Sequence, residues 1–141
     1  MELNRQGIQL VQQDRLEQAL DPLREAVGIA PEYYPAANNL AQVLFHLGKL
    51  DEAEPLLREL VRDHPAYLYA HATLLKLYRQ QDRIAEAREL VKVTDMPDET
   101  QPDAMAAWHI ELSNMYKQTG DDEKARRHIK FARDICPEML D

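Results

Sequence analysis

The chain lacks the residues and runs that several protein classes require. Its 141 residues include one cysteine, Cys136, which excludes an intramolecular disulfide and fits a reducing compartment. No apolar run approaches the length of a membrane-spanning helix, and the first six residues lack the positive start and apolar core of a signal peptide. Basic residues number 17 against 25 acidic ones, giving a net charge of −8. This balance argues against binding to nucleic acid or an anionic membrane, and we expect a cytoplasmic protein.

The patterns of catalytic and cofactor sites are missing as well. The sequence has no glycine-rich phosphate loop, and no histidine has cysteine or carboxylate companions at metal-ligand spacing within one helix. Nothing near Ser113 indicates an activated nucleophile. Among the five histidines, only His46 falls on a surface where a ligand could meet it, and we interpret it as a polar groove residue. We therefore predict a protein without catalytic activity, cofactor or metal. An enzyme is a weaker hypothesis than either of the two binding functions described below.

What the sequence does contain is an internal repeat. Ala19, Ala53 and Ala87 follow one another at equal intervals of thirty-four positions, and Ala125 comes after a slightly longer interval of thirty-eight. Residues of similar size recur around each alanine: nine positions before it (Leu10, Leu44, Tyr78, Tyr116) and four positions after it (Leu23, Leu57, Val91, Ile129). A fixed period in this range predicts one supersecondary unit that is copied and stacked.

The repeat resembles the tetratricopeptide repeat, whose helix–turn–helix unit has this same period. The runs 48–53 and 120–125 look like the family's turn and the start of its second helix. The resemblance implies an all-α, right-handed α-solenoid of four repeats (about 1–33, 34–67, 68–101 and 102–137) within a single domain, 1–141. The sequence departs from the family where an aromatic is often found, since the four copies carry Leu3, Ala37, His71 and His109, and it carries four additional residues, which we place within 95–102.

Apolar residues three and four apart support helices independently of the resemblance. Gly48 and Gly120 fall where a helix ends and the chain reverses, a position that favours positive φ. Prolines at 31, 65 and 137 mark the ends of second helices, whereas Pro55 is expected in the first turn of its helix and Pro22 deeper within its own. The predicted helices span residues 2–13, 16–29, 35–47, 51–63, 67–80, 84–94, 103–119 and 121–134.

The first helix of each pair lines the concave side of such an array, so residues on its outer face are candidates for ligand binding. Helical spacing at 100° per residue places Asn4, Ile8, Val11 and Gln12 of the first copy on this face. The same positions in the later copies supply most of the candidate peptide-binding groove, and Asn39 is added because it matches a peptide-binding asparagine of the family, described below. The groove comprises Asn38, Asn39, Gln42, Phe45, His46, Lys76, Arg79, Asn114 and Lys117.

This groove is rich in side-chain amides, which can pair with the main chain of an extended peptide. Lys76, Arg79 and Lys117 form a basic patch with no acid among the assigned positions, which predicts a protein or peptide partner with acidic groups. Some members of the family hold chaperone tails through a two-carboxylate clamp of lysine, asparagine and arginine. Only Asn39 matches that clamp, and we reject chaperone-tail binding.

A second surface is expected at the last helix, which offers Ile129, Phe131, Ile135 and Met139 with nothing after it to cover them. A partner, a second copy or a neighbouring domain could cover this end. Two functions therefore stay open. The first is an adaptor that binds a protein segment in its groove, and the second is a structural module that forms homo-oligomers or assembles with a parent protein through this end.

Overall fold

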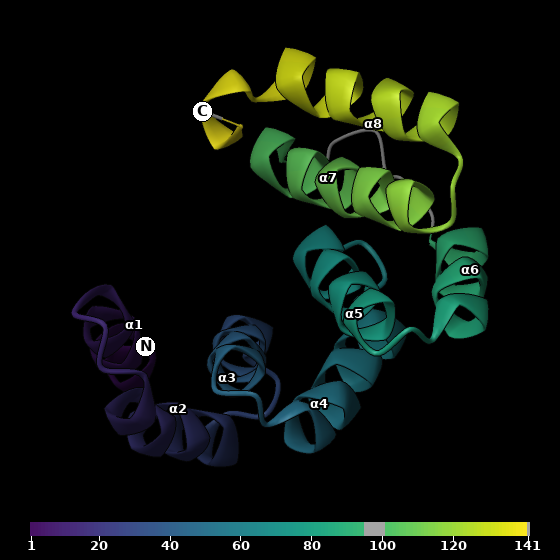
Figure 1. Cartoon of the computed structure of the whole chain (residues 1–141). Helices are drawn as coiled ribbons and strands as arrows, with labels where there is room; N and C mark the ends of the chain where they lie inside the picture. The colour runs from purple at the N-terminus through teal and green to yellow at the C-terminus, as the bar shows by residue number, and fades with distance from the viewer. Residues whose placement is uncertain (95–100, 141) are drawn as a thin grey trace. The chain divides into compact units, whose positions relative to one another are not determined.

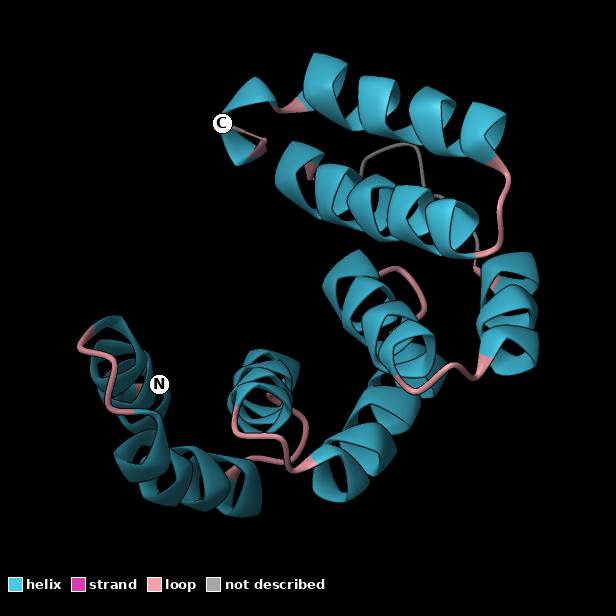
Figure 2. Ribbon diagram, in the orientation of Figure 1, coloured by secondary structure: helices cyan, strands magenta, loops and turns pink. Residues whose placement is uncertain are grey.

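The structure, a computed structural model, describes residues 1–94 and 101–140. Helices dominate the described residues, which contain no strand (Figures 1 and 2). The elements are α1 (Glu2–Gln12), α2 (Leu16–Ile29), α3 (Tyr34–His46), α4 (Leu50–Asp63), α5 (Leu68–Gln80), α6 (Ile84–Val93), α7 (Pro102–Gln118), α8 (Asp122–Ile135) and the short 3₁₀ helix η1 (Pro137–Met139). Every predicted helix is present, with bounds within one residue of those expected.

The chain divides into two compact units, Met1–Asp63 and His64–Asp141, here called unit 1 and unit 2. Unit 1 contains the pairs α1/α2 and α3/α4, and α2 also packs against α3. Unit 2 contains the pairs α5/α6 and α7/α8, and α5 packs against α7. Each unit therefore holds two helix–turn–helix repeats; the single domain of 1–141 stays a prediction.

The four repeat alanines lie in the tightly packed interior of the helix pairs. Ala19, Ala53, Ala87 and Ala125 are all fully or almost fully buried. In the first pair, a Cβ added to Gly7 would lie only 2.5 Å from Leu23 Cγ, so α1 and α2 leave no room for a side chain at Gly7. In the last pair, the Ser113 hydroxyl donates to the Ala125 carbonyl oxygen at 2.8 Å. The alanine period is thus a consequence of tight helix-pair packing.

The turn between the two helices of each repeat has one backbone conformation in all four copies. Gly48 and Gly120 have φ of 78° and 86°, which confirms the prediction. Asp14 and Asp82 occupy the equivalent positions with φ of 58° and 57°. In each turn the next amide donates to the carbonyl five residues earlier, as Lys49 N does to Leu44 O at 2.8 Å, which is the Schellman arrangement.

Prolines follow two of the three expected rules. Pro31, Pro65 and Pro137 each come two residues after a helix end, as predicted, and Pro22 lies inside α2. The expectation for Pro55 is wrong, because α4 begins at Leu50 and Pro55 is its sixth residue, past the first turn. The predicted insertion falls largely on 95–100, outside the described residues.

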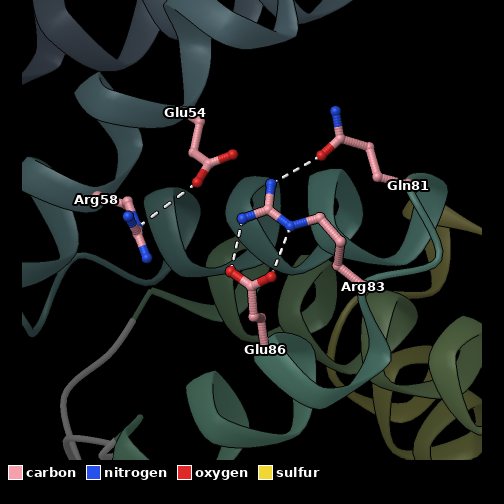
Figure 3. A network of polar contacts seen from close by, with 5 residues as sticks. All are labelled: Glu54, Arg58, Gln81, Arg83 and Glu86. Carbon is pink, nitrogen blue, oxygen red and sulfur yellow. Dashed lines mark hydrogen bonds and ion pairs between the residues drawn. The ribbon is translucent and has the colours of Figure 1, made fainter.

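Local ion pairs contribute modestly to the stability of second helices. Arg83, at the start of α6, donates to both carboxylate oxygens of Glu86 (2.8 and 2.6 Å) and to Gln81 Oε1 at 2.9 Å (Figure 3). Within α4, Arg58 Nε lies 3.7 Å from Glu54 Oε2. Because these pairs are close in sequence and partly hydrated, each stabilises its helix by no more than about 0.5 kcal/mol.

Candidate peptide-binding groove

Unit 1 contains a groove of about 370 Å³ between α1 and α3. Helix α1 contributes Ile8, Val11 and Gln12, which share one face at the spacing of a helical turn. Helix α3 contributes a matching face at i, i+3, i+4 and i+7, and the turn after α1 and the start of α2 complete the lining. The residues are Asn39, Gln42, Val43 and His46 from α3, Asp14 from the turn and Leu16 from α2.

The apolar part of the groove is accessible to a ligand. Ile8 and Val11 are 36% and 38% exposed, although both are large aliphatic side chains in a chain of high charge content. Leu16 and the buried Val43 extend this apolar surface. Burial of apolar surface is favourable by about 25 cal/mol per Å², so an apolar side chain of a ligand that covers this surface contributes favourably to the free energy of binding.

Polar side chains at the groove are held in set orientations. Asn39 Nδ2 donates to Asn4 Oδ1 at 2.9 Å, which joins α3 to α1. His46 Nδ1 lies 2.7 Å from the Gln42 carbonyl oxygen, one turn earlier on α3. A carbonyl oxygen only accepts, so His46 carries its hydrogen on Nδ1 and its Nε2 is unprotonated in the neutral ring.

Of the nine predicted groove residues, the structure brings Asn39, Gln42 and His46 together in this groove. Asn38 and Phe45 lie on α3 as well but are buried, and Asn38 Oδ1 has no hydrogen-bond partner among the described residues. The groove face of α3 is therefore rotated by about one residue from the face assumed. Of the first-copy positions, Ile8, Val11 and Gln12 line the groove, whereas Asn4 is buried beneath it.

Three lining residues escaped the sequence analysis: Asp14, Leu16 and Val43. Asp14 had an available signal, because it stands one full repeat period before Gly48 and so occupies the repeat's turn. Leu16 and Val43 had none, since an apolar residue near a helix pair is ordinarily part of the core.

The other four predicted residues lie in unit 2. Arg79 on α5 is paired with Glu111 on α7, with Nη2 3.3 Å from Oε2, and both side chains are less than one-fifth exposed. Burial raises the pKa of Glu111, while Arg79 and Lys76 oppose that shift. The basic patch thus includes an acidic residue that the sequence analysis missed, and part of its charge is already compensated.

Lys117 and Asn114 lie on α7, Lys117 exposed and Asn114 partly exposed. An acidic partner for this patch stays a prediction.

The predicted assembly residues divide into two kinds. Ile135 packs against the buried cluster of Ala106, Ala132 and Cys136, and Ile129 is partly buried. Phe131 and Met139 are 46% and 40% exposed. The Phe131 ring also contacts that of His109, with centroids 4.3 Å apart.

Other kinds of site find little support in the described part of the chain. No group of three or more His, Cys, Asp or Glu side chains there is arranged to hold a metal ion. None of the described helices has the length and apolar character needed to cross a membrane.

Comparisons with known proteins agree with this fold. A family model described as tetratricopeptide repeat matches residues 10–66 and 48–107. Among solved structures, the thermophilic TPR protein TTC0263 of Thermus thermophilus is 23% identical with a TM-score of 0.81, covering 96% of this chain and 74% of that one. MamA (41-end) from Desulfovibrio magneticus RS-1 is 20% identical with a TM-score of 0.72, covering 94% and 73%. MamA MSR-1 is 22% identical with a TM-score of 0.64, covering 94% and 74%. A search of curated proteins found no match.

Proposed function

The chain belongs to the tetratricopeptide repeat family, and we propose that it is a protein-interaction scaffold that binds a peptide segment in the groove of unit 1. The observation that carries this proposal is the pairing of exposed apolar side chains with oriented polar ones in one cavity. Ile8 and Val11 supply the apolar surface, while Asn39 and His46 supply hydrogen-bonding atoms. Such a mixture of an apolar surface and a few fixed polar groups is typical of a binding site.

The size of the groove sets the scale of the ligand. About 370 Å³ is at the lower end of the range for ligand pockets, which suits one or two side chains of a peptide. The remaining affinity would come from hydrogen bonds between the main chain of the peptide and the first helices of unit 1, α1 and α3. A groove lined by helices recognises a segment through a few anchoring side chains.

The first experiment screens a library of random short peptides for binding and then compares variants. Replacing two aliphatic side chains in Ile8→Ser/Val11→Ser removes most of the apolar surface. It should weaken the selected peptides at least about tenfold. Fluorescence anisotropy of labelled peptides measures this change.

Ile29→Ser is the matched control, because Ile29 is 65% exposed on α2 and does not line the groove. It should leave peptide affinity unchanged. Peptides that bind wild type and Ile8→Ser/Val11→Ser equally well would overturn the proposal.

A second candidate function is assembly through the surface of α8 and η1. Phe131 and Met139 are exposed there, at 46% and 40%. Covering them in a complex would remove apolar surface from water. This candidate places the interaction on unit 2 and is independent of the groove.

A further inference from the structure

Resting on the proposed function, we propose that the groove of unit 1 selects a basic segment: an apolar anchor side chain with lysine or arginine beside it. Three features of the groove support this choice of partner: its charge, its unfilled hydrogen-bond acceptors and the charge of the unit that surrounds it.

The charge of the groove lining has one sign. Asp14 is its single ionisable acid, and the lining contains no lysine or arginine. Asp14 is exposed, and no cation lies within ion-pair distance of it among the described residues. A cationic side chain of a ligand therefore finds an available carboxylate in the groove lining, whereas an acidic one is repelled by that carboxylate.

The groove lining also offers hydrogen-bond acceptors. The Asn39 amide nitrogen donates to Asn4, and Asn39 Oδ1 is an acceptor. The contact of His46 Nδ1 with the Gln42 carbonyl leaves His46 Nε2 as an acceptor in the neutral ring. Together with the Asp14 carboxylate, these atoms accept hydrogen bonds from a ligand, while the side-chain amides of Gln12 and Gln42 both donate and accept. Lysine and arginine side chains donate and never accept, so they match the acceptors of the groove.

The surrounding unit reinforces the preference. Residues 1–63 carry 11 acidic and 6 basic side chains, so unit 1 has a formal net charge of −5. A potential of this sign raises the local concentration of basic segments and slows the approach of acidic ones. An apolar anchor is needed as well, because exposed ion pairs alone give weak binding.

The test uses three acetylated and amidated peptides of equal length with the same two leucines. Their flanking positions are all lysine, all glutamate or all serine. Anisotropy titrations at about 50 mM salt should give the affinity order lysine, serine, glutamate. The lysine preference should shrink as salt increases, because ions screen exposed charges.

Asp14→Asn is the decisive variant, because asparagine tolerates the left-handed backbone of this turn and keeps the shape of the side chain. It should reduce the lysine-over-serine preference about two- to fivefold, as expected for one exposed ion pair. Asp21→Asn is the control, since Asp21 is an exposed acid of α2 outside the groove lining. It removes the same charge and should change the preference far less.

The outcomes separate this inference from the proposed function. If the glutamate peptide binds as tightly as the lysine peptide and Ile8→Ser/Val11→Ser still weakens binding, the groove function stands and the basic partner is wrong. Equal effects of Asp14→Asn and Asp21→Asn would also overturn the selection by groove residues. Failure of all three peptides to bind would overturn the groove function itself.

Discussion

Two glycines of unit 1 are predicted to respond in opposite directions to the same substitution. Gly28 lies within α2, and an added Cβ would meet no atom within 4 Å. Gly28→Ala should stabilise the protein by about 0.5–1 kcal/mol, because alanine loses less backbone freedom on forming a helix.

Gly48 has equally open surroundings but a φ of 78°. Gly48→Ala should destabilise by about 1 kcal/mol, because a Cβ is unfavourable in the left-handed region. Urea unfolding of both variants measures the difference. Shifts of the two midpoints in the same direction would show that backbone conformation does not control these positions.

Some individual groove residues could be predicted from the sequence and others could not. Gln42 and His46 were found by helical spacing, and Asn39 by comparison with the clamp that some members of the family carry. Asn38 and Phe45 were assigned to the same face but are buried, since an error of one residue rotates a helix by 100°. The orientation of Asn39 and His46 depends on contacts with Asn4 and a main-chain oxygen, which no sequence pattern specifies.

At the scale of elements, α7 and α8 are joined by a pair of histidines. His109 Nδ1 and His128 Nδ1 lie 2.9 Å apart, and the ring planes differ by only 20°. One ring must donate and the other accept, so the contact requires that at least one ring lacks a proton on Nδ1. His109 is buried, and its Nε2 has no partner among the described residues. Protonation of this pair therefore opposes the packing of α7 on α8.

Acid should accordingly weaken the folded state. Burial, with a contribution from His128, lowers the pKa of His109 from 6.5 to about 4, and burial also lowers the pKa of His128. Between these pH values the unfolded chain binds protons that the folded chain does not, so stability is complete above about pH 6.5 and declines as pH falls toward 4. Urea midpoints measured from pH 7.5 to 4.5 should decrease.

His109→Gln should flatten that dependence, because glutamine keeps a polar partner for His128 without titrating. The slope of stability against pH should fall by at most about 1.4 kcal/mol per pH unit, the value for one proton. Identical slopes in wild type and His109→Gln would rule out the histidine pair as a source of acid sensitivity.

Helix positions were the most predictable level of the structure, and the reason is the repetition itself. The same turn occurs in all four copies, so the positions of Gly48 and Gly120 also indicate where the chain reverses at Asp14 and Asp82. Pro55 was misplaced because α4 begins at Leu50, one residue earlier than predicted.

At the scale of the whole molecule, the period of the alanines was sufficient to identify the family and the all-α fold. It does not identify a partner, because related repeats keep their packing residues and vary the surfaces between them. Ile135 illustrates the limit: it was predicted to be part of an open surface, yet it packs with Ala132 and Cys136. Burial by η1 and by the adjacent helix could not be inferred from the last helix alone.

The remaining exposed residues of this surface provide a test of self-assembly. If a second copy covers Phe131 and Met139, sedimentation velocity should show a weight-average sedimentation coefficient that rises with protein concentration. Phe131→Glu/Met139→Glu should abolish the rise, because two buried carboxylates are costly in an apolar interface. Ile135 is left unchanged, since its replacement would disturb the core.

Ile29→Glu is the control, because it adds a carboxylate at another exposed apolar residue, on α2. It should sediment as wild type does. A coefficient independent of concentration in wild type, or a rise that persists in Phe131→Glu/Met139→Glu, would exclude this surface as the contact between copies. Of the two candidate surfaces, only the peptide groove of unit 1 would then remain as a proposed binding site. Its apolar residues would be the first to replace in a search for natural partners.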